Sequence, residues 1–115
     1  MFSLSELVDI YGVPTLVKLS NDNPGADEND PSNINTTLIS NLLAEMEGQY
    51  GSLVLQYPHL KNKVYRLIIL LLHKRRQQQG HLLMEPALQK EYEDILAELQ
   101  KYKIILFEVH YGKGK

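Results

Sequence analysis

Apolar residues fall at helical spacing along most of this 115-residue chain. Near the C-terminus they share one face, and charged residues occupy the other, which predicts an amphipathic helix opened by Glu85 and Pro86. A second stripe over residues 38–50 predicts a helix that starts at Asn35 or Thr36. We expect this helix to end near Gly48 and Gly51, before an elbow at residue 58, which is a proline.

Residues 59–79 predict the central helix, and its middle, residues 67–72, is apolar on every side. A helix of this kind must be covered all round. A small bundle can hardly do this alone, so we expect a neighbouring subunit to cover part of the helix.

Two short helices are expected before these. Ser3 and Glu6 make a capping-box pattern ahead of the first helix, and Gly12 and Pro14 end it. Residues 15–19 predict the second. Residues 20–34, rich in Asn, Asp, Pro and Gly, predict a long exposed loop.

The C-terminal end has a different character. Residues 104–111 are mostly β-branched and aromatic, which is typical of a strand. No partner strand is expected within the chain, so this segment is expected to pair with another chain. The sequence thus predicts an all-α bundle of about four to five helices over residues 1–103, with the loop at 20–34, then an extended, strand-like tail at 104–115.

Composition indicates what broad class of protein this is, but it says little about the function. A hydrophobic content of 43% indicates a folded domain, and a net charge of −2 argues against a protein that coats nucleic acid. The chain has no cysteine, which excludes disulfides, thiolate metal sites and cysteine nucleophiles. No signal peptide is visible and the longest apolar run is too short to span a bilayer, so we expect no membrane association.

Little in the sequence points to catalysis or to a metal. The acidic residues of the loop lack the spacing of an EF-hand, which favours a solvated segment over a calcium site. The histidines do not recur at metal-binding intervals, and no nucleophile accompanies the paired acids. The residues concerned are Asp22, Asp27, Glu28, Asp30, His59, His73, His81, His110, Glu45 with Glu47, and Glu91 with Asp94. We predict no catalytic residue, no metal and no cofactor, and therefore not an enzyme.

Lys74, Arg75 and Arg76 give the central helix a basic end that could contact phosphates. The favoured interpretation is that they solubilise the helix end and complement its dipole. A third possibility is weak contact with DNA that passes through the lumen of a ring.

Several short motifs resemble, in order, those of the Mu-like head–tail connector proteins of tailed bacteriophages. They are Ser3-Leu4-Ser5-Glu6-Leu7, Tyr11-Gly12, Leu16 with Leu19-Ser20, Ala44-Glu45-Met46-Glu47-Gly48-Gln49-Tyr50 and Tyr57-Pro58. The resemblance covers roughly residues 1–100 in the order of elements. The chain departs from the family in its apolar residues 69–72, where small residues are usual, and in its strand-like end.

The resemblance implies a structural virion protein without enzymatic activity. It would assemble in the host cytoplasm and sit in the virion neck at the portal vertex. There it would form a homo-oligomeric ring, twelve-fold by the resemblance, between the portal protein and the tail or stopper protein.

Within that ring, the portal or subunit interface would comprise Ile104, Ile105, Leu106, Phe107, Val109 and Tyr111. Lys74, Arg75 and Arg76 would contact DNA at most transiently. The alternative is a small helical nucleic-acid-binding or regulatory module that uses this basic helix end.

Overall fold

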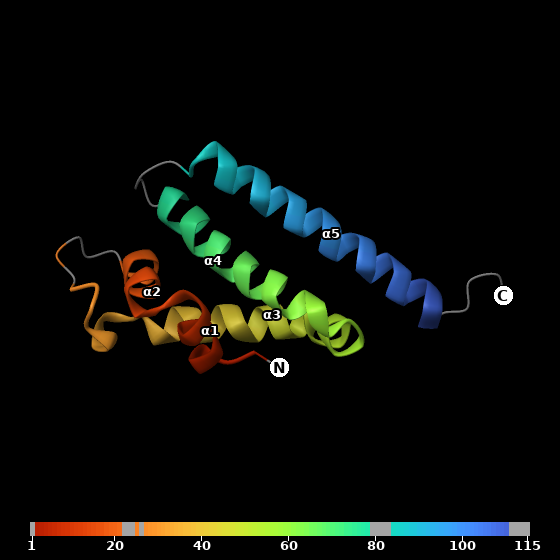
Figure 1. The fold of residues 1–115 in the computed structure, drawn as a ribbon, viewed down its shortest axis with the longest axis horizontal. Coiled ribbons are helices and arrows are strands. Elements are labelled where there is room, and N and C mark those ends of the chain that lie inside the picture. Colours follow the sequence, from red (N-terminus) through yellow and green to blue (C-terminus); the bar gives the residue numbers. More distant parts are fainter. Residues whose placement is uncertain (1, 22–24, 26, 79–83, 111–115) are drawn as a thin grey trace.

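The computed structural model describes residues 2–21, 25, 27–78 and 84–110 (Figure 1). Within these residues the chain forms five α-helices, two short 3-10 helices and no strand, so the predicted all-α class is confirmed. The elements are α1 (Leu4–Tyr11), α2 (Val13–Ser20), η1 (Pro31–Asn33), α3 (Thr36–Gln56), η2 (Pro58–Leu60), α4 (Lys61–Gln78) and α5 (Pro86–His110).

Local hydrogen bonds explain where the helices begin. The Ser3 side chain accepts a hydrogen bond from the backbone N–H of Glu6 at 3.1 Å, and Asn35 accepts one from Leu38 N–H at 3.1 Å. Each bond satisfies an N–H group that the first turn of a helix cannot pair. Gly12 joins α1 to α2 with a φ of +85°, which glycine adopts without a steric penalty. These boundaries agree with the prediction.

The predicted end of α3 at Gly48 and Gly51 is wrong, because the helix continues to Gln56. Its buried stripe runs past both glycines to Leu53 and Val54. This burial outweighs the roughly 1 kcal/mol that a glycine costs within a helix. The helix ends instead at the elbow predicted at residue 58.

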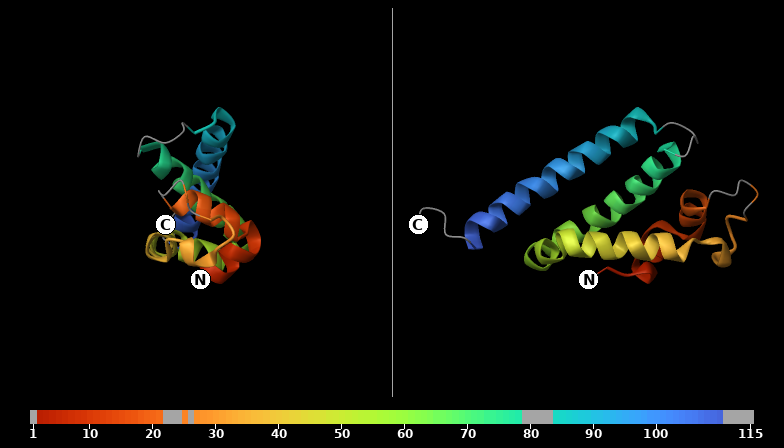
Figure 2. Two further views of the ribbon diagram at one scale, coloured as in Figure 1. Left: turned by 90° about the vertical axis from the view of Figure 1, so that its left-hand side faces the viewer. Right: turned by 180° about the vertical axis from the view of Figure 1, so that it is seen from behind.

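The helices form two layers. α4 and α5 are an antiparallel pair that lies over α1, α2 and α3, as the views in Figures 1 and 2 show. The molecule is elongated, with extents of 58 × 29 × 18 Å, and α5 runs along its length. The last turns of α5 therefore lie at one end of the molecule.

The expectation that a neighbouring subunit covers the apolar middle of α4 is wrong. α2, α3 and α5 all contact α4, and together they cover it. Of residues 67–72, only Leu71 is half-buried, and the others are at most 2% exposed. α4 is thus the centre of a core that the chain completes alone. The buried residues of α4 are Val64, Tyr65, Leu67, Ile68, Ile69, Leu70 and Leu72.

The segment predicted as a long loop at 20–34 contains more regular structure than expected. Ser20 is buried in α2, and its hydroxyl accepts a hydrogen bond from the Asn35 N–H at 3.3 Å. Asp30 caps η1 by accepting from the Ser32 N–H at 3.0 Å. Residues 22–24 and 26 of the predicted loop lie outside the described residues.

The strand predicted at residues 104–111 is wrong as far as the structure describes it, because residues 104–110 are the last turns of α5. A helix pairs its own backbone groups, whereas a lone strand would leave them unpaired. Leu106 also continues the stripe of Leu99 and Tyr102 that packs on the core. Residues 111–115 lie outside the described part of the chain.

Candidate interaction surface

The last turns of α5 follow a firm anchor. The ring of Tyr102 lies 4.9 Å from that of Tyr57 and 5.6 Å from that of His59, measured between centroids. The next residue, Lys103, places its Nζ 5.0 Å from the centre of the Tyr50 ring. These contacts fix α5 against the C-terminal end of α3 and against η2, so the surface beyond them has a rigid base.

Beyond this anchor, α5 is apolar on nearly every side. Ile104, Phe107 and Val109 are 51%, 62% and 66% exposed, whereas Ile105 and Leu106 are half-buried. Successive residues of a helix are rotated by about 100°, so these five side chains surround the helix axis. We call residues 104–109 the apolar tip. Tyr111, which was predicted with them, lies outside the described residues.

The exposure of the apolar tip is unusual for a surface helix, which normally keeps apolar residues to one face. Three large apolar side chains that are more than half exposed thus lie within six residues of one helix and form an exposed apolar patch. Such patches are often functional. Three of the residues predicted as an interface, Ile104, Phe107 and Val109, are thus exposed, although they lie on a helix and not on the predicted strand.

The basic end of α4 is largely engaged within the chain. The Nζ of Lys74 lies 5.0 Å from the centre of the Tyr92 ring. Arg76 donates hydrogen bonds to the carbonyl oxygens of Lys18 and Asn21 at 2.6 and 2.7 Å. Arg75 is half-buried. Arg76 thus provides hydrogen-bond donors for carbonyl groups at the C-terminal end of α2. This supports the interpretation that the basic cluster stabilises helix ends.

A cavity of about 180 Å³ lies beside this basic end. It is lined by Lys18, Leu19, His73, Arg76, Met84, Glu85 and Leu88. Burial lowers the pKa of His73, and the nearby charges of Arg66, Arg76 and Lys18 lower it further. The lowered pKa favours the neutral imidazole, so His73 adds no positive charge to the cavity at neutral pH.

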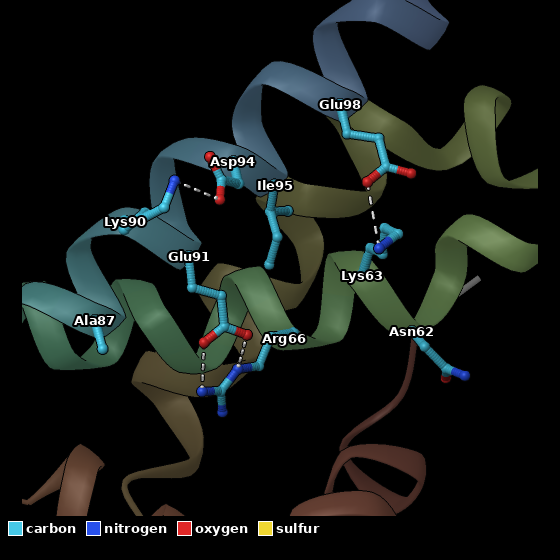
Figure 3. A pocket seen from close by; sticks show the side chains of 9 residues that line it. All are labelled: Asn62, Lys63, Arg66, Ala87, Lys90, Glu91, Asp94, Ile95 and Glu98. Atoms are coloured by element: carbon cyan, nitrogen blue, oxygen red, sulfur yellow. Dashed lines mark hydrogen bonds and ion pairs between the residues drawn. The ribbon is translucent and has the colours of Figure 1, made fainter.

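A larger groove of about 440 Å³ separates α4 from α5, and ion pairs cross it (Figure 3). Arg66 holds Glu91 through two hydrogen bonds of 2.7 and 2.8 Å, and Lys63 lies 3.2 Å from Glu98. The bidentate bond from Arg66 lowers the pKa of Glu91. A carboxylate held in its charged form is unsuited to act as a general acid.

The other paired acids do not meet a histidine in the part of the chain that the structure describes. Asp94 faces Lys90 on its own helix at 3.5 Å, and Glu45 accepts a hydrogen bond from Gln49 at 3.3 Å. Among the described residues, no three His, Asp or Glu side chains are close enough to hold a metal ion. His81 lies outside these residues.

A partly apolar groove between the N-terminal segment and α3 was not predicted from the sequence. Phe2 is almost fully buried, and its ring packs edge-on against Tyr65 at 5.5 Å. The backbone N–H of Ser3 donates to the Tyr65 hydroxyl at 3.1 Å, which holds this segment in place. We call the resulting hollow of about 310 Å³ the N-terminal groove; it is lined by Phe2, Ser3, Leu4, Ser40, Leu43, Ala44 and Glu47.

Comparison of the chain with protein-family models, with curated proteins and with solved structures gave no match. None of the helices in the described residues is long and apolar enough to cross a membrane.

Proposed function

We propose that this chain is a structural adaptor of a phage virion, a head–tail connector that forms a ring on the portal and links it to the tail or stopper. The observation that carries the proposal is the apolar tip of α5, which is exposed at one end of the molecule. Desolvating such a surface requires a partner protein. The order of short motifs described above suggests that this partner is the portal or the adjacent subunit of the ring.

The basic end of α4 gives less support to a nucleic-acid-binding module. Lys74 and Arg76 already contact Tyr92 and the end of α2. Phosphate binding would have to compete with these contacts. In the proposed ring, DNA makes at most transient contact with this region, and neither a cofactor nor a catalytic group is required.

Reconstitution with the portal protein of the same phage tests the proposal. The full chain is mixed with assembled portal, and the complex is measured by sedimentation and by electron microscopy. We expect a ring of this chain on the portal, and we expect Phe107→Asp to weaken assembly of this ring on the portal by at least about tenfold, as loss of an interface hot spot does. Ala97→Asp, which adds the same charge at an exposed position of α5 before the tip, is the matched control.

Mass spectrometry of purified virions provides a second, independent measurement. The chain should be present in a copy number that matches a ring. Virions that lack the chain, together with no binding to the portal, would overturn the proposed function.

A further inference from the structure

Among the described residues, two apolar features that are accessible to solvent lie on different layers of the molecule. One is the apolar tip, on the C-terminal turns of α5, which project at one end of the molecule in Figure 1. The other is the N-terminal groove, which is concave and lies in the layer of α1 and α3. A projecting apolar helix end and an apolar hollow have complementary shapes, as in helix-in-groove recognition.

We propose that copies of this chain associate head to tail, with the apolar tip of one copy seated in the N-terminal groove of the next. Phe107 is the largest exposed side chain of the tip and enters the groove of the next copy, with Ile104 beside it. Of the apolar residues that line the groove, Phe2 and Leu43 are almost fully buried, so the receiving surface is offered mainly by Leu4 and Ala44.

The distribution of charge selects a second copy as the occupant of the groove. Residues 1–60 contain eight acidic residues and one basic residue, Lys18. Residues 61–115 contain eleven basic and six acidic residues. The groove belongs to the acidic half of the chain and the tip to the basic half. Two copies in head-to-tail contact therefore bring opposite charges together, which favours encounter and fixes orientation.

The same complementarity holds close to the two features. Glu47 lines the groove, Glu45 is exposed nearby, and α3 has no lysine or arginine. Before the tip, Lys101 is exposed and Lys103 is half-buried. Each feature also has a charge of the opposite kind.

Glu108 is exposed on the tip, and Lys61 lies near the groove in an ion pair with Glu6 at 2.6 Å. Lys61 is already paired. Glu108 is outnumbered by the two lysines, so the net attraction remains.

A contact between two different surfaces leaves one tip and one groove open in every pair. Further copies can then be added until the assembly closes as a ring or extends as a filament. The inference rests on the proposed function only for closure into a ring. The contact itself follows from the shape and charge of the chain.

The test is a mixing experiment on the full chain, measured by sedimentation velocity over a range of protein concentrations. Phe107→Asp disables the tip and keeps the groove, whereas Ala44→Lys fills the groove and keeps the tip. Both positions are exposed, so the helices should persist, and circular dichroism checks this. Ala97→Asp and Ser52→Lys are the matched controls on exposed positions of α5 and α3.

We expect the unmodified chain and both controls to form oligomers, and each disabling variant alone to associate at least about tenfold more weakly. An equimolar mixture of the two disabling variants should form a one-to-one dimer that does not grow, because it contains one intact tip and one intact groove. A mixture that remains monomeric would overturn the inference. So would oligomers that survive Ala44→Lys, since they would indicate tip-to-tip contact.

The outcome for this contact is separable from that for the proposed function. Binding to the portal by a chain that shows no tip-to-groove contact would remove the inference and leave the adaptor function. Head-to-tail oligomers that never bind the portal would support the tip-to-groove contact and remove the adaptor function.

Discussion

Ser3 shows how one side chain can define the start of an element and its place in the fold. Its hydroxyl caps α1, and its backbone N–H donates to the hydroxyl of Tyr65 on α4. The cap was predictable, because a hydroxyl three residues before an acid is a local signal. The bond to Tyr65 was not, because the two residues are 62 positions apart in the sequence.

Ser3→Ala should lower the free energy of unfolding by about 1 kcal/mol, because the N–H of Glu6 loses its acceptor. Urea denaturation followed by circular dichroism measures this change. Ser5→Ala, at an exposed position within α1, is the control and should change stability by less than about 0.5 kcal/mol. Equal effects of the two substitutions would show that the cap contributes nothing.

His73 should make the stability of the fold depend on pH. Burial and the charges of Arg66, Arg76 and Lys18 lower its pKa, while Glu85 opposes them. As the pH falls, His73 therefore takes up a proton near pH 6.5 in the unfolded chain, but only at a lower pH in the folded chain. The contribution of neutral His73 to the free energy of unfolding is therefore fully present above pH 6.5. It is lost as the pH falls through the lower pKa of the folded state.

The melting temperature should accordingly fall between pH 7.5 and pH 5. In His73→Gln, which cannot titrate, the decline over this range should be smaller than in the unmodified chain. Thermal unfolding at several pH values measures the difference. An identical pH dependence in the two proteins would exclude His73 as its source.

At the scale of elements, the hydrophobic pattern correctly predicted where most helices lie. It was less successful in predicting where a helix ends and which other elements pack against it. Pro58 correctly predicted the end of α3, because a proline disfavours helical backbone angles in the residue before it. Gly48 and Gly51 were not, because the packing of Leu53 and Val54 maintains the helix. Which elements cover α4 is a property of the tertiary arrangement, and no local pattern carries it.

The β-branched residues of the apolar tip illustrate the same limit. Their propensity favours a strand, but the preference is weak and depends on a neighbouring strand to pair with. In the described residues no strand is present, and Leu106 lies on the same face as Leu99 and Tyr102. Tertiary context therefore decides for a helix.

Truncation after Lys103 tests this assignment. It removes seven helical residues, 104–110, and the helical signal of the whole chain should fall accordingly. The remaining chain should still unfold cooperatively, because the anchor of Tyr102 on Tyr57 and His59 is kept. Circular dichroism of the truncated and full chains measures both properties. An unchanged total helical signal would show that these residues are not helical in solution.

At the scale of the whole molecule, the two layers differ in charge as well as in position. The ion pairs Lys61–Glu6, Lys63–Glu98 and Arg66–Glu91 are all made by α4, which lies between the acidic N-terminal layer and α5. None of these pairs could be read from the sequence, because each joins residues at least 25 positions apart and depends on how the helices pack. The N-terminal groove was missed for the same reason. Charged residues that do not pair with α4 remain on the outer surfaces. The N-terminal half therefore still presents mainly negative charge to a partner, and the C-terminal half mainly positive charge.

Self-association through the tip and the groove should consequently weaken as salt is added. Charges are screened over about 10 Å at 0.1 M salt and about 3 Å at 1 M, whereas burial of Phe107 is not weakened by screening. Sedimentation at increasing sodium chloride should show oligomers dissociating in the unmodified chain. Glu47→Lys should associate more weakly at low salt, and combining it with Lys101→Glu should restore part of the loss because the attraction is rebuilt with the signs exchanged. Association that is insensitive to salt and to both substitutions would mean that apolar contact alone joins the copies and that the charge asymmetry serves another purpose.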